Sequence, residues 1–243
     1  MKKLKIALIG YGKMGKEIEK IALTKGHTIQ VKIDTAQDWE TQMQLLLVSD
    51  VAIDFSIPDI AIINMNKCLE LNIPLVIGTT GWYAHMNEIE EKTKSNNGSL
   101  LWASNFSLGV NITFYFNELL AKTMSRFPEY KAYIHEIHHT KKLDAPSGTA
   151  IGLAKGIIDS TAQLKDWKLE EGSEIKSSDL LISHAREGNV PGTHEVRYTS
   201  DIDEIMLRHE AKSRKGFASG AVLAAEWLLG KKGFFNMSDV LGF

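Results

Sequence analysis

The sequence predicts an α/β fold, in which a doubly wound parallel sheet carries a second, central domain of α+β type. Up to Asn105, short apolar runs alternate with segments of helical periodicity, which is typical of a parallel sheet covered on both faces. After Asn105 the strand-like runs lack intervening helices, which predicts a mainly antiparallel sheet. Residues 217–229 return to a helical pattern with closely spaced alanines. We expect this last helix to dock on the first domain, so that residues 1–107 and 217–243 form one discontinuous domain around residues 108–216.

The elements of the first domain follow from periodicity and from turn residues. Met14, Ile18 and Ala22 are spaced to lie on one face of a helix. Gly26 ends that helix, because glycine tolerates the left-handed backbone found at helix C-termini. Short apolar runs predict buried strands between such helices. The expected strands are residues 4–9, 29–34, 51–55, 75–77 and 100–103, and the expected helices are residues 14–25, a segment that opens at Pro58, and residues 83–94.

The second domain is expected to begin with a helix over residues 110–124. Residues 130–138 then alternate between apolar and polar side chains, as in a half-exposed strand. Further strands are expected over residues 174–183, 194–199 and 204–211.

A glycine pattern, Gly10-Tyr11-Gly12-Lys13-Met14-Gly15, joins the first strand to the first helix. In such a loop the first glycine allows a tight turn, the second lets the backbone approach a diphosphate, and the third lets helix and strand pack closely. The N–H groups at the positive end of the helix then face the diphosphate. Asp34, at the end of the second strand, is placed to accept hydrogen bonds from an adenosine ribose. We therefore predict a Rossmann-type domain that binds NADH or NADPH.

Two later strand ends carry polar segments, Gly78-Thr79-Thr80-Gly81 and Ala103-Ser104-Asn105-Phe106. In an open parallel sheet the ligand crevice lies outside the carboxyl ends of the strands. We expect both segments to line the nicotinamide half of the cofactor. Each segment would equally suit an ordinary helix-capping turn.

The densest group of reactive side chains lies before and at the start of a predicted helix. Its members are His138, His139, Lys142, Asp144, Ser147, Gly148 and Thr149. A helix start with exposed N–H groups, two hydroxyls and a positive dipole suits a carboxylate ligand. Histidine and lysine beside an anion site are the groups that a proton-transfer step uses. We expect no metal site from His138, His139 and Asp144, because adjacent strand residues point to opposite faces.

The overall composition argues against several classes of partner. A formal net charge of -2 and a pI near 6.5 leave no basic field that would attract nucleic acid or anionic lipid. The short apolar run at the N-terminus is interrupted by Gly10 and Lys13, unlike a secretory signal, and no segment has the length of a membrane span. The single cysteine, Cys68, fits a reducing compartment and a buried structural role. We therefore expect a soluble, cytoplasmic protein.

Taken together, these motifs resemble the dihydrodipicolinate reductase family nearly end to end. The resemblance includes the segments at 10–15, 54–56, 78–81, 105–107, 138–149 and 192–194. It implies a Rossmann domain completed by the C-terminal helix, and a central domain that binds a small dicarboxylate substrate and builds a homotetramer. The implied reaction is the reduction of 4-hydroxy-tetrahydrodipicolinate to tetrahydrodipicolinate and water, in lysine and diaminopimelate biosynthesis.

The resemblance also implies roles for individual residues. His138 would be the acid/base residue, His139 a substrate contact and Lys142 the proton donor. Gly148 and Thr149, with Ser147 in the same turn, would hold a substrate carboxylate. The cofactor would contact Gly10, Tyr11, Gly12, Lys13, Met14, Gly15, Asp34, Gly78, Thr79, Thr80, Ala103, Ser104, Asn105 and Phe106.

The family pattern leaves the choice between NADH and NADPH open. Only nineteen residues separate Asp34 from Asp54, so the adenosine side of the pocket is trimmed. Asp34 carries negative charge where a 2′-phosphate would sit, and no arginine follows it. Lys13 is the residue that could compensate. We expect NADH to serve at least as well as NADPH.

Two other functions fit parts of the pattern. An oxidoreductase that acts on an amino-acid semialdehyde would also use the Ser147–Thr149 turn, but it should carry a reactive cysteine or a lysine–aspartate pair. Cys68 lacks such a context. A module that only senses NAD would keep the glycine loop, but would have no reason to bring His138 and Lys142 together with Ser147.

Overall fold

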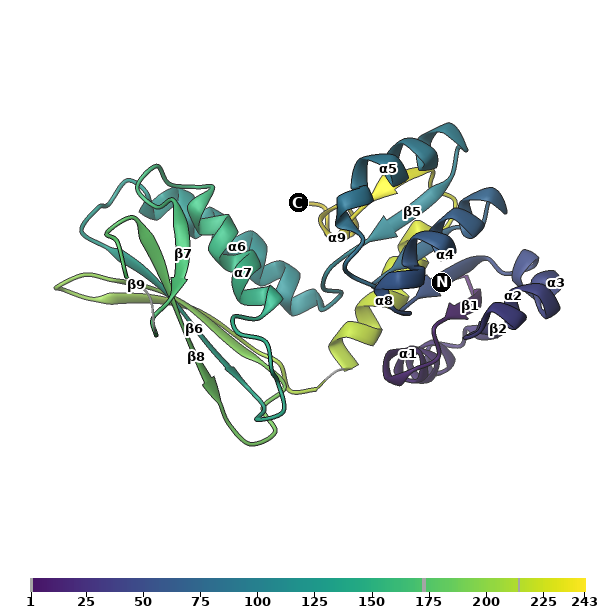
Figure 1. Ribbon diagram of the computed structural model, residues 1–243, viewed down its shortest axis with the longest axis horizontal. Coiled ribbons are helices and arrows are strands. Elements are labelled where there is room, and N and C mark those ends of the chain that lie inside the picture. The colour runs from purple at the N-terminus through teal and green to yellow at the C-terminus, as the bar shows by residue number, and fades with distance from the viewer. Residues whose placement is uncertain (1, 172–173, 214) are drawn as a thin grey trace. The chain divides into compact units, whose positions relative to one another are not determined.

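The computed structural model describes residues 2–171, 174–213 and 215–243 (Figure 1). The chain forms two compact units, of which the first comprises Met1–Ser107 together with Lys215–Phe243 and the second comprises Leu108–Arg214. The second boundary lies two residues earlier than the sequence suggested. Arg214 itself lies outside the described residues.

The first unit contains a six-stranded sheet in the order β11-β5-β4-β3-β1-β2, with every neighbouring pair parallel. Its strands are β1 (Lys5–Ile9), β2 (Thr28–Ile33), β3 (Val51–Asp54), β4 (Leu75–Ile77), β5 (Ser99–Trp102) and β11 (Gly233–Phe235). Because β2 and β3 lie on opposite sides of β1, the strand order reverses there. A crevice therefore opens at the carboxyl ends of β1 and its neighbours, which is where open parallel sheets bind ligands.

Helices cover both faces of this sheet. They are α1 (Lys13–Thr24), α2 (Ala36–Thr41), α3 (Met43–Leu47), α4 (Pro58–Glu70), α5 (Met86–Ser95), α8 (Lys215–Leu228) and α9 (Met237–Leu241), with a short 3₁₀ turn at Tyr83–His85. One apolar cluster joins α1 and α8 to the sheet, and a second joins α2, α3, α4 and α5 to it. The three-layer Rossmann-type architecture predicted from the alternating pattern is confirmed. Cys68 is buried in the second cluster.

The small residues of α8 allow this helix to lie close to the rest of the first unit. Ala221, Ala224 and Ala225 are fully buried. A Cβ atom added at Gly220 would overlap the carbonyl oxygen of Phe106. The helix therefore needs glycine at this position for close packing.

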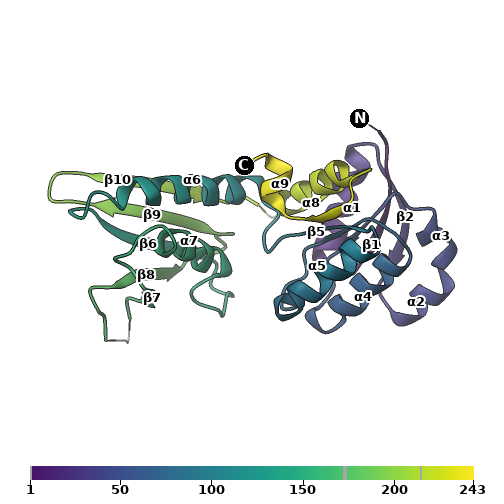
Figure 2. The ribbon, with the colours of Figure 1, turned by 90° about the horizontal axis from the view of Figure 1, so that it is seen from above.

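The second unit contains a five-stranded sheet in the order β10-β9-β6-β8-β7, and α6 and α7 pack on one face of it (Figure 2). Its elements are α6 (Leu108–Met124), β6 (Lys131–His138), α7 (Gly148–Ile158), β7 (Asp166–Leu169), β8 (Asp179–Arg186), β9 (Thr193–Thr199) and β10 (Glu204–Glu210). The prediction that the second sheet is mainly antiparallel is wrong. β9 pairs antiparallel with β6 and β10, but β8 pairs parallel with β6 and β7. The parallel pairing of β6 and β8 is possible because α7 supplies the crossover between them.

Edge strands and short helices account for the other differences. The strand expected over residues 174–183 begins later, at Asp179, and ends at Arg186. β7 and β11 were not expected because each is a short edge strand whose pairing, rather than its side-chain periodicity, defines it. The short helices α2, α3 and α9 have too few residues to show a helical period.

Gly220→Ala should lower the free energy of unfolding by about 1–3 kcal/mol, because the added methyl group forces α8 away from Phe106. Gly216→Ala in the same helix is the matched control, since the nearest atom to its added Cβ is Ser107 Oγ at an ordinary 3.5 Å. Alanine has the higher helix propensity, so this control should be neutral or stabilising by up to about 1 kcal/mol. Urea unfolding of both variants measures the difference. Equal stabilities would contradict the close packing of α8.

Candidate active site

The glycine loop of the first unit combines close packing with one open position. Gly10 has a φ of +80°, and a Cβ atom there would lie 2.6 Å from the carbonyl oxygen of Phe55. A Cβ atom at Gly15 would overlap the carbonyl oxygen of Gly10. At Gly12, by contrast, a Cβ atom would meet nothing within 4 Å. Two glycines thus fix the turn, and the third leaves space in which a diphosphate can approach the backbone.

A cavity of about 450 Å³ lies beside this loop. Its lining residues are Ile9, Gly10, Gly12, Ile33, Asp34, Thr35, Ala36, Trp39, Phe55, Ser56, Ile57, Ile60, Ile63, Asn64 and Lys67. Ile57 and Ile63 are 57% and 52% exposed, so they present apolar surface to the cavity. A largely apolar cavity with a few polar groups at its edge fits the adenosine half of a dinucleotide.

Asp34, which the sequence analysis proposes as a ribose contact, is one of the residues that line this cavity. Its Oδ1 accepts a hydrogen bond of 2.8 Å from the N–H of Tyr11, which ties the glycine loop to the end of β2. The Tyr11 hydroxyl bonds to Glu19 and accepts a 2.9 Å hydrogen bond from Lys32. The side chain of Tyr11 is therefore engaged within the protein. Lys13 is exposed, Met14 packs against the apolar core, and neither is a lining residue of the cavity.

A second carboxylate, Asp38, occupies the corner next to Asp34. Its Oδ2 accepts hydrogen bonds from the N–H groups of Asp34 and Thr35, at 2.9 and 2.8 Å, and from the Thr35 hydroxyl at 2.9 Å. These bonds, led by that from Asp34, hold the pKa of Asp38 below its usual value. Lys67 is a cation at the cavity that sequence reasoning missed, and its Nζ lies 4.6 Å from the Trp39 ring centroid.

The ends of β3 and β4 are organised by the buried side chain of Asp54. Asp54 accepts hydrogen bonds from Ser56 N–H, Asn64 Nδ2 and the Thr79 hydroxyl, at 2.8, 2.9 and 3.0 Å. Burial raises the pKa of Asp54, and these hydrogen bonds oppose the rise. Thr79, predicted to contact the cofactor, thus turns its hydroxyl inward, whereas Thr80 is exposed.

Aromatic rings fill the space beside the remaining predicted nicotinamide contacts. The Phe55 ring covers Gly78, where an added Cβ would overlap it, and its centroid lies 5.6 Å from that of Phe106. Ala103 and Phe106 are buried, while Ser104 is exposed. Asn105 Oδ1 accepts a 2.8 Å hydrogen bond from Ser107 N–H. Both polar segments follow strands of the parallel sheet at its carboxyl edge, as predicted.

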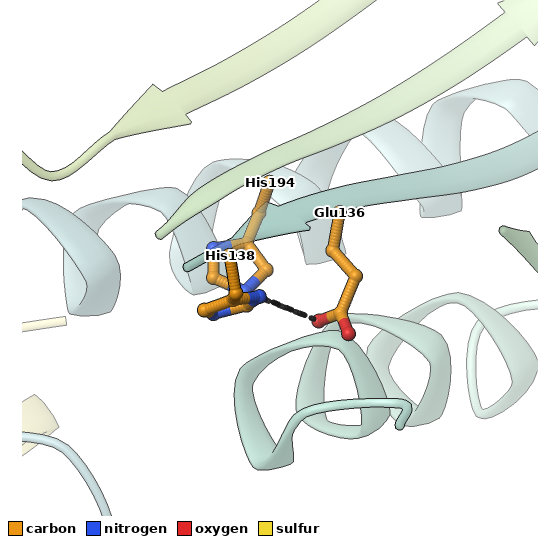
Figure 3. A group of neighbouring side chains, drawn as sticks. All are labelled: Glu136, His138 and His194. Carbon is orange, nitrogen blue, oxygen red and sulfur yellow. Dashed lines mark ion pairs between the residues drawn. The ribbon is translucent and has the colours of Figure 1, made fainter. Parts of the chain in front are cut away.

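A second group of reactive side chains lies on neighbouring strands of the second unit, and Figure 3 shows its members on β6 and β9. Glu136 and His138 share one face of β6 because they are two residues apart. The sheet register places His194 of β9 opposite Glu136, and Arg186 of β8 opposite His138. In Figure 3 the two imidazole rings and the Glu136 carboxylate point toward one another. Glu136 is 0% exposed.

The Glu136 carboxylate has donors or cationic groups on several sides. Both of its oxygens accept hydrogen bonds of 3.1 Å from Ser147 N–H. Three nitrogens lie slightly farther away: His138 Nδ1 and His194 Nε2 at 3.6 Å from Oε2, and Arg186 Nη1 at 3.7 Å from Oε1. Burial alone would raise the pKa of Glu136, but the hydrogen bonds and positive neighbours outweigh it and lower the pKa to about 2. Glu136 is therefore ionised near neutral pH.

The pKa of His138 is lowered as well, but for a histidine this leaves the side chain uncharged. Burial lowers the pKa of His138 to about 4, although the nearby Glu136 carboxylate favours its protonated form. His138 is therefore neutral near pH 7 and can accept a proton. Gly192, with a φ of +155°, lies against the ring, and a Cβ atom there would come within 3.1 Å of His138 Nε2. Glycine at position 192 thus keeps a side chain away from this nitrogen.

Arg186 fixes the loop that carries the predicted proton donor. Its Nε donates to the carbonyl oxygen of Lys142 at 3.2 Å, and its Nη2 donates to that of Asp144 at 2.7 Å. Lys142 Nζ donates to Asp144 Oδ2 at 2.6 Å, and this bond lowers the pKa of Asp144. The ammonium group of Lys142 is thus held by a local carboxylate, at the surface of the second unit.

Ser147 begins α7 and connects it to the same cluster. Its hydroxyl accepts a 3.2 Å hydrogen bond from Ala150 N–H and lies 3.1 Å from His194 Nε2. Because its N–H bonds to Glu136, Ser147 has its polar groups engaged within the protein. The next residue, Gly148, is exposed, and a Cβ atom there would meet nothing within 4 Å. The first turn of α7 is therefore open beside Gly148.

Three members of this cluster were not predicted as site residues: Glu136, Arg186 and His194. Glu136 could have been found, because a residue two positions before His138 on a strand shares its face. Arg186 and His194 depend on strand register, which the sequence does not reveal. His139, half-buried, does not join the cluster, although its Nδ1 is buried without a hydrogen-bond partner in the part of the chain that the structure describes.

The cluster has the spacing of a metal site but does not need a metal ion. The ligand atoms of Glu136, His138 and His194 lie within 4.8 Å of one another. The Glu136 oxygens already accept Ser147 N–H and face the Arg186 guanidinium, which supplies the positive charge.

Among the described residues, no helix is both long and apolar enough to cross a membrane.

Comparisons with known proteins cover both units. Residues 4–106 match the family description "Dihydrodipicolinate reductase, N-terminus", and residues 109–241 match "Dihydrodipicolinate reductase, C-terminus". The chain is 48% identical over 238 residues to a 4-hydroxy-tetrahydrodipicolinate reductase of Christiangramia forsetii, covering 98% of both chains. It is 37% identical over 231 residues to the reductase of Rickettsia bellii, covering 94% of this chain and 90% of that one.

Solved structures agree with the fold. The chain superimposes with a TM-score of 0.74 on a dipicolinate-bound dihydrodipicolinate reductase from Paenisporosarcina sp. TG-14, at 21% identity and covering 97% of this chain and 98% of that one. The match over both units, together with the glycine loop and the His138–Thr149 constellation, shows that the chain belongs to the dihydrodipicolinate reductase family.

Proposed function

We propose that this chain reduces 4-hydroxy-tetrahydrodipicolinate to tetrahydrodipicolinate and water, with NADH or NADPH as the hydride donor. The observation that carries this proposal is the end-to-end family match. The family match argues against both alternatives. A semialdehyde oxidoreductase that uses a catalytic thiol finds no support, because Cys68 is buried and burial raises its pKa. The Lys142–Asp144 pair, which that class could use instead, lies within the segment 138–149 that resembles the reductase family. A pure NAD sensor would not need the buried Glu136–His138 arrangement.

The chemistry divides between the two units. The first unit holds the dinucleotide, which supplies two electrons as hydride when bound. Its glycine loop would hold the diphosphate, Asp34 the adenosine ribose, and the segments at Gly78–Thr80 and Ala103–Phe106 the nicotinamide end. The second unit supplies the groups for proton transfer. One proton must be added with the hydride to complete the two-electron reduction. Lys142 suits this donation because it is cationic. Loss of water from the hydroxy-bearing ring removes hydroxide and a proton from the neighbouring ring carbon, and neutral His138 suits acceptance of that proton.

The start of α7 is proposed to bind a substrate carboxylate. Gly148 and Thr149 lie at the positive end of an eleven-residue helix, where an anion is favoured. Ser147 shapes this turn through its bonds to Glu136 and His194. His139, one residue beyond β6, would contact the substrate. The dipicolinate ligand of the Paenisporosarcina structure is a dicarboxylate of the class expected here.

We propose that the protein forms a homotetramer through the second unit and acts in the cytoplasm. α6 and α7 pack on one face of the five-stranded sheet. The opposite face presents Tyr133, Arg197 and Met206, of which Met206 is 45% exposed. A copy of the same sheet could cover this surface. The free, buried Cys68 fits a reducing compartment.

Oxidation of NADH by the freshly prepared condensation product of pyruvate and aspartate semialdehyde tests the activity itself. NADH should give a kcat/KM at least equal to that for NADPH, because Asp34 carries negative charge where a 2′-phosphate would sit and Asp38 adds a second carboxylate next to it. Lys67, held over Trp39, is the cation that opposes them. A preference for NADPH greater than about tenfold would refute this assignment, and absence of turnover with both cofactors would refute the function.

His138→Gln and Lys142→Ala should each lower kcat by about 10²–10⁴-fold, the usual contribution of a general acid or base. The KM for NADH should not change, because both residues lie in the second unit and the cofactor binds to the first. Steady-state kinetics with varied NADH separates these parameters. If both variants kept more than about a third of wild-type kcat, neither would be a proton-transfer group.

Thr149→Val should weaken the binding of pyridine-2,6-dicarboxylate by about 1.5–3 kcal/mol, because it removes a hydroxyl donor from a charged ligand and preserves side-chain shape. Isothermal titration calorimetry in the presence of NADH measures the affinity. Thr161→Val, a threonine beyond the other end of α7, is the control and should bind the dicarboxylate like wild type. An unchanged affinity in Thr149→Val would refute the carboxylate assignment.

A further inference from the structure

Among the described residues, Glu136 is the one fully buried carboxylate near the proton-transfer groups, and the reaction assigned above gives it no role. It lies behind His138, with Oε2 3.6 Å from His138 Nδ1. Nδ1 is buried and has no hydrogen-bond partner among the described residues. Among the described residues, the charged atom nearest to Nδ1 is therefore Glu136 Oε2.

The charge of Glu136 decides which ring nitrogen of His138 carries the proton. A neutral imidazole has one N–H and one lone pair. If the lone pair were on Nδ1, it would face an anionic oxygen 3.6 Å away in a buried setting, where electrostatic repulsion is strong. If Nδ1 carries the proton, the same geometry is attractive. Distances between catalytic groups are often long before substrate binds and shorten in the complex.

We propose that Glu136 is a positioning residue that holds His138 as the Nδ1–H tautomer, so that Nε2 presents its lone pair for proton transfer. This inference rests on the role proposed above for His138. The carboxylate would also stabilise the imidazolium that forms when Nε2 accepts a proton, in the way that the buried aspartate supports the histidine of serine proteases.

The rest of the cluster supports this arrangement. Both Glu136 oxygens accept Ser147 N–H, so the carboxylate cannot rotate freely away from the ring. Gly192 adds no side chain next to Nε2, where a Cβ would come within 3.1 Å of this nitrogen. The other charged or titratable groups facing His138 are His194, Lys142 and Arg186, and each disfavours its protonation. Glu136 is the group that favours it.

The chain contains a natural reference for the opposite tautomer. In the first unit, His27 Nδ1 accepts a 3.1 Å hydrogen bond from Leu4 N–H, so its proton must lie on Nε2. That nitrogen lies 3.0 Å from Glu226 Oε1. His27–Glu226 is thus a second buried imidazole–carboxylate pair, remote in sequence from the reactive groups. Glu226→Gln is the matched control for Glu136→Gln.

Nitrogen-15 NMR of the histidine rings tests the tautomer in the full-length wild-type protein, with His138 assigned by the loss of its signals in His138→Gln. His138 should show a protonated Nδ1, whereas His27 should show a protonated Nε2. The His138 signals should titrate with a pKa of about 4. In Glu136→Gln this pKa should fall further, because the carboxylate that favours protonation is gone. A wild-type His138 in the Nε2–H form would overturn the proposal without requiring any Glu136 variant to fold.

Kinetics provide the second readout. Glu136→Gln keeps an acceptor for Ser147 N–H but offers an amide to His138, so kcat should fall by about 10²–10⁴-fold while the KM for NADH stays unchanged. Glu226→Gln should keep the wild-type kcat. A Glu136→Gln enzyme with wild-type kcat, alongside an impaired His138→Gln enzyme, would overturn the role of Glu136 alone. Wild-type kcat in His138→Gln would instead overturn the proposed role of His138.

Discussion

Burying an ionised carboxylate costs several kcal/mol unless charges and hydrogen bonds replace the lost water. In the second unit this requirement falls on Glu136, which is 0% exposed and has a pKa lowered to about 2. Its compensating groups come from different parts of the chain: Ser147 at the start of α7, His194 on β9 and Arg186 on β8. The need to neutralise one buried charge therefore brings together the segments that form the reactive cluster. Arg186 also donates a hydrogen bond to the carbonyl oxygen of Lys142, and so connects the loop around Lys142 to the same cluster.

The first unit uses a related arrangement at the carboxyl edge of its sheet. Asp54 is also fully buried, and it gathers donors from Ser56, Asn64 and Thr79. Ser56 follows β3, Asn64 lies on α4 and Thr79 follows β4. The two carboxylates differ in electrostatics, because Glu136 faces cationic groups whereas the donors to Asp54 are neutral. Accordingly the pKa of Asp54 is raised and that of Glu136 is lowered. A structural role suits Asp54, and the proposed role of orienting His138 suits the charged Glu136.

The sequence predicted what depends on local pattern. The parallel sheet, the glycine loop and Asp34 follow from periodicity and from short motifs, and the structure confirms the fold that they indicate. The sequence did not predict the mixed second sheet, because strand direction there depends on α7 as a crossover. It also did not predict that Arg186 and His194 would flank Glu136, since register is a property of paired strands. Lys67 was missed at the cavity because only the folded α2 and α4 bring it beside Trp39.

The discontinuity of the first unit has a consequence for how the protein is made. During synthesis the strands β1 to β5 leave the ribosome long before α8 and β11, which complete the apolar cluster on one face and the edge of the sheet. The second unit, in contrast, is one uninterrupted stretch of chain. The second unit therefore has its full set of contacts available to the growing polypeptide before the first unit does. Until the last 29 residues, 215–243, emerge, the sheet of the nucleotide-binding unit has an exposed apolar face and an unpaired β5 edge, a state in which unfinished chains are prone to associate.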